Sequence, residues 1–340
     1  MATEILAMTE VPSGPLASET HDASAPPLPQ SPAFFDIPPS HLQPHCHRLE
    51  KQVTEEVNGY FLEHWPFPTE KSRKKFVNAG FSEVTCWYFP MALDDRIHFA
   101  CRLLTILFLI DDLLEHMSLA DGEAYNNKLM PIMRGDVLPD RSSPVEYMAY
   151  DLWESMRAHD LEMTTEILEP VFTFMRAQTD ATRLRKMDLK EYFEYRERDV
   201  GKGLLAALMR FCMKLKLSPE DLSIARPVDM NCSKHLAVVN DIWSFEKELV
   251  ASKTAHEEGG VLCTGVAIFA DGAEVSAAAS KRVLYVLCRE WEVRHDELTA
   301  EVLAQCDTPE LRAYLKGLEY QMSGNEMWSR TTLRYLDPTE

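Results

Sequence analysis

The strongest constraint on the fold is a long succession of helix-length segments that proline and glycine interrupt. From about residue 45 onward, apolar residues recur at helical spacing, and no stretch shows the alternation typical of a β-strand. The pattern therefore predicts an all-α protein. Helix breaks are expected near Pro66–Pro68, Pro90, Pro131 to Pro144, Pro170, Pro219 and Gly259–Gly260.

The segments between these breaks predict the helices of a bundle. Helices are expected at residues 92–117, 144–159, 189–215, 231–250, 277–303 and 309–332. Because neither an internal repeat nor a linker follows residue 45, one helical domain covering 45–340 is the simplest interpretation. Residues 1–44 are rich in proline, serine and alanine, and they are expected to form a disordered arm.

The charge of the chain limits its partners. With 54 acidic and 35 basic residues, the formal net charge is -19, which argues against nucleic acid or an anionic membrane as a partner. An anionic substrate would need divalent cations to bridge it to the protein. No uncharged stretch reaches the length of a membrane span, and the N-terminus lacks the pattern of a signal peptide. Eight cysteines without CxxC spacing indicate reduced thiols and a cytoplasmic protein.

An apolar stripe in the segment 92–117 ends in carboxylates. Helical spacing that runs through Phe108 continues to Asp111 and then to Glu115, with Asp112 beside them. Carboxylates on a buried face are costly unless they are paired or bound to metal, and Mg²⁺ takes such oxygen ligands together with substrate phosphates. Alternatively, the helix end turns to solvent, where acidic side chains need no ligand.

A second acidic pair, Asp94–Asp95, precedes this stripe. It stands where the helix is expected to begin, and acidic residues at that end complement the helix dipole. We therefore expect this pair to cap the helix and not to bind metal.

A second polar cluster follows about 130 residues after the first. Asn240, Ser244 and Glu248 are spaced four apart, so their oxygen atoms fall on nearly one face of a helix, and Lys247 beside them can reach phosphate. Amide, hydroxyl and carboxylate oxygens suit a hard cation. Polar residues at this spacing also occur on solvated helix faces. Two such clusters together favour a pair of metal sites that grip one diphosphate between them.

The two clusters resemble the aspartate-rich motif and the N-D-x-x-S-x-x-x-E motif of class I terpene synthases. The wider similarity, from about Val57 to Tyr335, is to the fungal aristolochene synthases within that family. It includes residues 58–63, 88–90, 93–115, 134–136, 195–197, 240–248 and 317–328. The resemblance implies the α-helical terpenoid synthase fold, three Mg²⁺ ions, farnesyl diphosphate as substrate and a homodimer.

The resemblance also assigns roles to the two clusters. It implies that Asp111 is a metal ligand, and that Asp112 and Glu115 belong to the same cluster, where they orient the loop or form hydrogen bonds after closure. It further implies that one Mg²⁺ is held by Asn240, Ser244 and Glu248.

Four residues are implied to donate hydrogen bonds to the diphosphate, namely Arg196, Lys247, Arg334 and Tyr335. The fork of a guanidinium suits diphosphate oxygens, whereas lysine acts as a point charge. For Arg196 the alternative is an ion pair within its own helix, with Glu194 or Asp199.

The resemblance assigns the wall of the pocket to aromatic residues. A carbocation in a dry pocket is stabilised by aromatic faces and by apolar walls that exclude water. The matching residues are Tyr88, Phe108, Phe174 and Trp328. Without the resemblance, these four would be interpreted as ordinary residues of the hydrophobic core. Many class I cyclases have tyrosine in place of Trp243 or Phe245. Because neither residue is a metal ligand, the resemblance still implies ionisation of the substrate, but it implies the identity of the product less directly.

The resemblance implies a sesquiterpene cyclase of fungal secondary metabolism, which forms aristolochene by way of germacrene A. A synthase of the same mechanism with another product is the main alternative. Chain-elongating prenyltransferases carry a second aspartate-rich motif, whereas this chain has Asn240, Ser244 and Glu248. A catalytically silent helical binding protein is the alternative of another class.

Overall fold

The computed structural model describes residues 39–336, and within that range the chain contains helices and their connections but no strand. The predicted all-α fold is confirmed. Most of the predicted arm, residues 1–38, lies outside the described residues. No described helix combines the length and apolar character that crossing a membrane requires.

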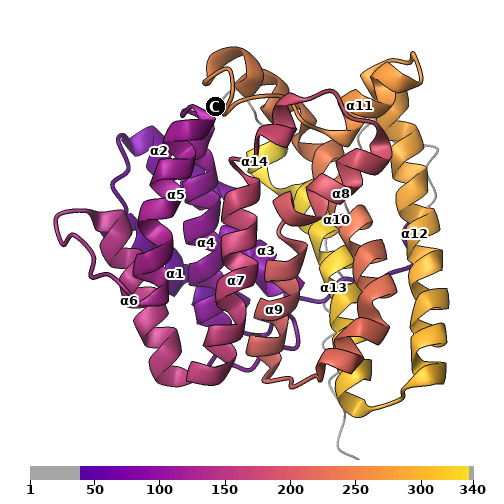
Figure 1. Ribbon diagram of the computed structural model, residues 1–340, viewed down its shortest axis with the longest axis horizontal. Coiled ribbons are helices and arrows are strands. Elements are labelled where there is room, and N and C mark those ends of the chain that lie inside the picture. The colour runs from indigo at the N-terminus through magenta and orange to yellow at the C-terminus, as the bar shows by residue number, and fades with distance from the viewer. Residues whose placement is uncertain (1–38, 337–340) are drawn as a thin grey trace, which may run out of the picture.

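The helices follow one another through short connections (Figure 1). Their bounds are α1 Glu50–His64, α2 Glu70–Ala79, α3 Phe81–Tyr88, α4 Ile97–Leu114, α5 Leu119–Arg134, α6 Pro144–His159, α7 Leu161–Ala177, the 3₁₀ helix η2 Ala181–Leu184, α8 Leu189–Asp199, α9 Lys202–Met213, α10 Pro219–Thr254, α11 Gly265–Gly272, α12 Ala277–Gln305, α13 Pro309–Thr331 and α14 Leu333–Leu336.

The predicted helix 189–215 is wrong, because it is two helices. Gly201 separates α8 from α9 with a φ of 72°, in the left-handed region that favours glycine. A side chain at this position would also lie 3.2 Å from the ring of Phe174. The predicted break at Pro170 is wrong as well, since Pro170 lies inside α7. The break predicted from Pro131 to Pro144 is confirmed, because α5 ends at Arg134 and α6 begins at Pro144.

The predicted helix 231–250 is part of a longer one. α10 has 36 residues and begins at Pro219, where the fixed φ of proline suits the first helical turn. Ser218 precedes it and its hydroxyl accepts a hydrogen bond from the main-chain N–H of Asp221, which satisfies one of the unpaired donors of the first turn.

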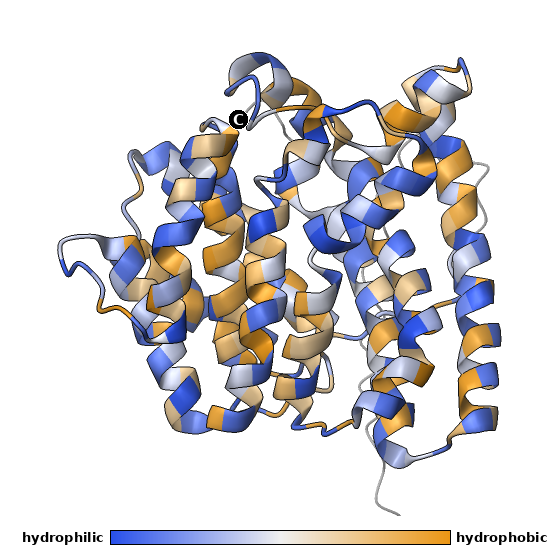
Figure 2. Ribbon diagram, in the orientation of Figure 1, coloured by the Kyte–Doolittle hydropathy of each residue, from blue (hydrophilic) through white to orange (hydrophobic). Residues whose placement is uncertain are grey.

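α4 lies in the interior, and hydrophobic residues cover much of its length in Figure 2. Ile97, Leu103 and Ile110 are fully buried. The prediction that Asp94–Asp95 caps this helix is wrong: Arg96 holds the capping position and its side chain makes no capping bond. Asp94 instead pairs with Arg48, and Asp95 pairs with His159.

The helices around α4 and α10 bring distant parts of the chain together. α3 packs between α4 and α13, and α10 packs along both α12 and α13. In Figure 1 the short helices α8, α11 and α14 gather near one end of the bundle, at the top of the view. α14, the last described helix, contacts both α2 and α10 there.

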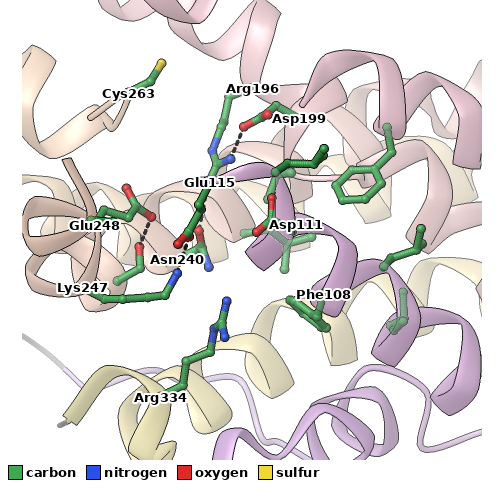
Figure 3. Close-up of a pocket in the computed structure, with 18 of the residues that line it drawn as sticks. Phe108, Asp111, Glu115, Arg196, Asp199, Asn240, Lys247, Glu248, Cys263 and Arg334 are labelled. Atoms are coloured by element: carbon green, nitrogen blue, oxygen red, sulfur yellow. Dashed lines mark hydrogen bonds and ion pairs between the residues drawn. The ribbon is translucent and has the colours of Figure 1, made fainter. Parts of the chain in front are cut away.

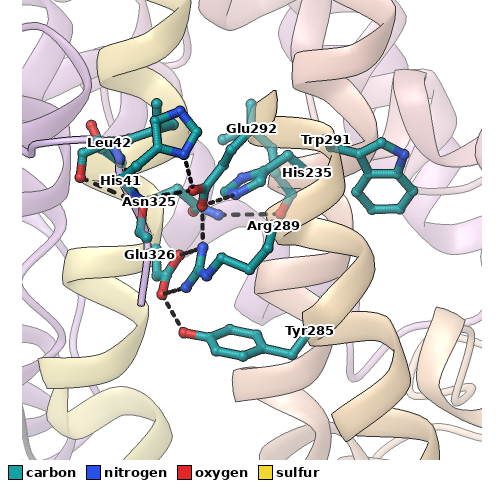
Figure 4. A network of polar contacts seen from close by, with 12 residues as sticks. His41, Leu42, His235, Tyr285, Arg289, Trp291, Glu292, Asn325 and Glu326 are labelled. Atoms are coloured by element: carbon teal, nitrogen blue, oxygen red, sulfur yellow. Dashed lines mark hydrogen bonds and ion pairs between the residues drawn. The ribbon is translucent and has the colours of Figure 1, made fainter. Parts of the chain in front are cut away.

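A buried ionic network joins α10, α12 and α13 (Figure 4). Arg289 pairs with the carboxylates of Glu292 and Glu326, and His235 lies 3.4 Å from Glu292. The main-chain N–H of His41 donates to Glu292 at 3.3 Å. The network therefore anchors the first described residues to the helical bundle.

Candidate active site

The first acidic cluster lies where α4 ends. One carboxylate oxygen from each of Asp111, Asp112 and Glu115 lies within 4.8 Å of the others. Glu115 is the C-terminal capping residue of α4, and its N–H donates to the carbonyl of Asp111 at 3.1 Å. The end of the helix thus holds three carboxylates close together, which costs free energy unless cations compensate them.

Asp111 is the member of this cluster whose charge is least compensated. Burial, followed by the charges of Glu115 and Asp112, raises the pKa of Asp111 to about 6. Its carboxylate accepts one hydrogen bond, at 2.8 Å, from the amide of Gln178, the residue that follows α7. A buried carboxylate of this kind attracts a cation.

Asp112 faces the other way and binds α14. Arg334 donates two hydrogen bonds to its carboxylate, at 2.6 and 3.0 Å. Burial favours the neutral acid, but Arg334 and then Lys247 outweigh that effect and lower the pKa of Asp112 to about 2. Asp112 is therefore a charged partner of two cationic side chains.

The second cluster lies on one face of α10, as its spacing predicted. Ser244 donates to Glu248 at 2.6 Å, and Asn240 donates from its amide to the hydroxyl of Tyr335 at 2.9 Å. The carbonyl oxygen of Asn240 accepts from Arg196 at 2.7 Å. Three oxygen-bearing side chains of α10 therefore face α8 and α14 across a cavity (Figure 3).

The cationic side chains reach the cavity from three helices. Arg196 comes from α8, Lys247 from α10 and Arg334 from α14, and Figure 3 shows the three side chains around the cavity. Lys247 pairs with Glu115. Burial and Arg334 oppose the charge of Lys247, but Asp112 and Glu115 raise its pKa, so it stays protonated.

The ion pair considered for Arg196 is present, and it lies in the cavity. Arg196 contacts Asp199 on its own helix and Asp241 on α10, the latter at 3.2 Å. Burial raises the pKa of Tyr335 to about 12, so its hydroxyl remains a neutral donor.

One cavity gathers all the candidate residues except Asp112, which points toward Arg334. The four aromatic candidates, Tyr88, Phe108, Phe174 and Trp328, line it from four different helices. The polar atoms of two have protein partners: Tyr88 donates to Asn325 at 2.7 Å, and Trp328 donates to the carbonyl of Ala79 at 3.1 Å. Leucines complete the wall, namely Leu104, Leu107, Leu204, Leu205 and Leu236.

Comparison with known proteins fits this geometry. A family model described as terpene synthase family 2, C-terminal metal binding, matches residues 102–294, which include both clusters. The chain belongs to the terpene synthase family.

Individual relatives of this terpene synthase cover most of its length. An aristolochene synthase from Aspergillus terreus is 71% identical over 88% of this chain and 94% of its own. A (+)-aristolochene synthase from Penicillium expansum is 67% identical over 88% of this chain and 91% of its own. The crystal structure of aristolochene synthase from Penicillium roqueforti superposes with a TM-score of 0.78 at 57% identity, covering 87% of this chain and 99% of that one. The predicted family and fold are confirmed.

The donor chemistry of this terpene synthase fits divalent metal ions. The first cluster offers carboxylate oxygens within a few ångströms of one another, and the second offers an amide, a hydroxyl and a carboxylate. Oxygen ligands of this kind suit hard cations such as Mg²⁺ and do not suit soft metals. Asp111 and Glu248 line the cavity, and among the described ion pairs neither has a cationic partner, whereas Glu115 pairs with Lys247.

Several polar residues of the terpene synthase cavity escaped sequence reasoning. Asp199, Gln178, Arg183 and Asn325 line or contact it. Asp241 stands inside the second motif but faces away, where Tyr192 and the N–H of Gly265 donate to it. Asp241 could have been found from its position within the motif, and Asp199 from its spacing of three after Arg196. Gln178, Arg183 and Asn325 belong to no recognisable spacing.

The two residues of the second motif that differ from many relatives do not belong to the wall of the cavity. Neither Trp243 nor Phe245 is among the described residues that line the cavity. Phe245 is buried and packs under the ammonium group of Lys281, 4.8 Å from its ring centroid. The missing hydroxyl groups therefore do not alter the surface that faces the cavity.

Proposed function

We propose that this terpene synthase is a sesquiterpene cyclase that converts farnesyl diphosphate to aristolochene and diphosphate. The observation that carries the proposal is the composition of one cavity, which combines oxygen ligands and cationic side chains with an aromatic and leucine wall. The substrate has a matching charged head and apolar chain. The names of the relatives from Aspergillus terreus and Penicillium expansum support aristolochene as the product.

The polar side of the cavity suits cleavage of the bond between C1 and the diphosphate oxygen, whose electron pair leaves with the diphosphate. Three Mg²⁺ ions held by Asp111 and by Asn240, Ser244 and Glu248 would neutralise the negative charge of the leaving group. Further donors for its oxygens come from three helices, namely Arg196, Lys247, Arg334 and Tyr335. These donors hold C1 toward the aromatic wall.

The apolar side of the cavity suits the ring closures. C1 forms a bond to C10, and loss of a proton gives germacrene A. Protonation of this neutral triene then drives the second closure, and a methyl shift, a hydride shift and loss of another proton give aristolochene. Protons gained and lost balance, so the two hydrocarbons are isomers. Tyr88, Phe108, Phe174 and Trp328 present aromatic faces to the cations. We assign the proton transfers to the diphosphate that remains bound.

The proposal is tested by gas chromatography–mass spectrometry of the volatiles that the purified protein forms from farnesyl diphosphate and Mg²⁺. Aristolochene as the main product, and none in a matched reaction with EDTA, is the expected result. Another sesquiterpene would retain the reaction class but contradict the product. Absence of hydrocarbon from folded protein, with both farnesyl and geranyl diphosphate, would contradict the proposal and favour a silent binding protein.

Three further proposals concern the whole chain. We propose that residues 45–340 form the catalytic domain, that the enzyme is a homodimer and that it works in the cytoplasm, where its eight free cysteines would stay reduced. Light scattering of the eluting protein during size-exclusion chromatography tests the dimer, since a monomeric mass of 38.9 kDa would contradict it.

A further inference from the structure

Phe81 lies directly behind the aromatic wall without being part of it. It is the first residue of α3, only 2% of it is exposed, and it is not among the described residues that line the cavity. Gly80 before it has a φ of 66°, which makes a sharp corner between α2 and α3. We call residues Ala79 to Phe81 the α2–α3 corner.

The ring of Phe81 stacks on the ring of Phe108. Their centroids are 4.6 Å apart and their planes differ by 9°, a nearly parallel arrangement. Phe108 contacts Trp328 at 6.1 Å as well, with a tilt of 38°. Because Phe81 covers one face of Phe108 from outside the cavity, it fixes the plane in which the other face is presented.

The same ring of Phe81 also contacts the diphosphate side of the site. The guanidinium carbon of Arg334 lies 5.2 Å from its centroid, within the range of a cation–π interaction. Arg334 is also the residue that binds Asp112 with two hydrogen bonds. Phe81 therefore contacts one residue assigned to the diphosphate and one assigned to the carbocation.

The α2–α3 corner holds the C-terminal part of the wall too. The carbonyl of Ala79 accepts hydrogen bonds from Trp328 at 3.1 Å and from Thr332 at 2.9 Å. At Gly80, a Cβ atom would lie 3.4 Å from the indole nitrogen of Trp328. The corner thus fixes Trp328 and Phe108 relative to each other and to α14.

We propose that Phe81 is a positioning residue that sets the orientation of Phe108 and thereby decides how efficiently the second ring closes. The inference rests on the proposed function. In that reaction a neutral monocyclic triene must accept a proton before the second closure, and the new cation needs an aromatic face turned toward it. A Phe108 ring that can tilt stabilises this cation less well, so more of the triene leaves unreacted.

The test compares the ratio of monocyclic to bicyclic hydrocarbon made by the wild type and by Phe81→Leu, with Mg²⁺ present. Loss of part of a cation–π interaction should raise this ratio by about threefold to tenfold. Partial unfolding lowers both products together and leaves the ratio unchanged, so the ratio separates positioning from a general structural role. Phe81→Tyr keeps the ring and should restore the wild-type ratio.

Matched variants complete the design. Phe61→Leu removes another buried ring, which contacts Tyr60, Trp65 and Phe76, and it should leave the ratio unchanged. Because Phe81 acts through Phe108, Phe81→Leu should add nothing to the ratio in a Phe108→Leu background. If Phe81→Leu does not fold, the volume-conserving Phe81→Met decides by the same measurement.

The outcomes distinguish the two proposals. An unchanged ratio in the folded Phe81 variants, with a wild type that makes the bicyclic hydrocarbon, overturns the positioning role. An equal rise in Phe61→Leu overturns it as well. A wild type that makes no hydrocarbon at all overturns the proposed function instead.

Discussion

Arg334 and Asp112 are joined by two hydrogen bonds, although 222 positions separate them in the chain. The contact fastens α14, the last described helix, to the end of α4, where the first acidic cluster lies. The guanidinium of Arg334, which we assign to the diphosphate, is therefore already held in place by Asp112 of the acidic cluster. Its orientation does not have to be found when the substrate arrives.

Replacing Arg334 by alanine should lower kcat/KM for farnesyl diphosphate by about 100-fold to 1,000-fold, because a preorganised charged donor to the leaving group is lost. Arg334→Lys should fall between this variant and the wild type, since lysine keeps the charge but not the fork. Steady-state kinetics measures both. Arg226→Ala, which removes a surface pair with Glu197, is the control and should stay close to wild type. Equal kinetics for Arg334→Ala and Arg226→Ala would contradict the assigned role.

Glu248 and Glu246 provide a matched pair on one helix. Glu248 lines the cavity beside Ser244, whereas Glu246 is exposed and pairs with Lys281 at 2.7 Å. Glu248→Gln should raise the Mg²⁺ concentration at half-maximal activity by about 10-fold to 100-fold, because it removes the charge of a proposed metal ligand. Glu246→Gln should leave it unchanged. A titration of activity with Mg²⁺ gives both values, and equal curves would argue against metal binding by this face.

Gly259 allows the segment after α10 to pack against the end of α4. A Cβ atom here would lie 2.4 Å from the carbonyl oxygen of Leu114 and 2.9 Å from that of Glu115. Gly259→Ala should therefore displace this segment from the first cluster and lower kcat/KM by about 100-fold. Gly272→Ala, with no atom within 4 Å of the added methyl group, is the control. Wild-type kinetics in Gly259→Ala would show that this contact is dispensable for activity.

His295 predicts a pH dependence of stability. It is 2% exposed, and burial is the main cause that lowers its pKa to about 4. Asp296 opposes this shift, whereas His235 and Lys202 strengthen it. The unfolded chain binds a proton near pH 6.5, whereas the folded chain does so only near pH 4. The free energy of unfolding therefore falls as the pH drops from 6.5 to 4.

His295→Gln removes this proton uptake. Between pH 7 and pH 5 the variant should lose about 2 kcal/mol less unfolding free energy than the wild type. Urea denaturation at the two pH values measures the difference. His64→Gln changes a histidine whose side chain is 46% exposed, and it should behave as the wild type. A His295→Gln variant with the full wild-type loss would contradict the argument.

Periodicity located the helices well where burial alone determines them. The predicted helix 144–159 has the bounds of α6, and 309–332 ends one residue beyond α13. It failed at Gly201, since a single left-handed residue leaves the apolar pattern on both sides intact. It also failed at Pro170, because tertiary packing can hold a helix together across one missing N–H donor.

The candidate site could be predicted in part. Asn240, Ser244 and Glu248 share a face of one helix, so their grouping follows from spacing alone. Their partners could not be predicted in the same way. The pairing of Lys247 with Glu115 spans 132 positions, and the stacking of Phe81 on Phe108 depends on how two helices pack. Such contacts arise from the tertiary arrangement and leave no local pattern.

The length of α10 has a consequence for how this enzyme can change through evolution. Its 36 residues extend for about 54 Å, from the capping serine at one end to the segment beyond the second cluster. One residue inserted or deleted between Pro219 and Asn240 would rotate the face that carries Asn240, Ser244 and Glu248 by about 100° relative to the packing before it. Substitutions can accumulate along this helix, but length changes can be tolerated only in the connections on either side of it.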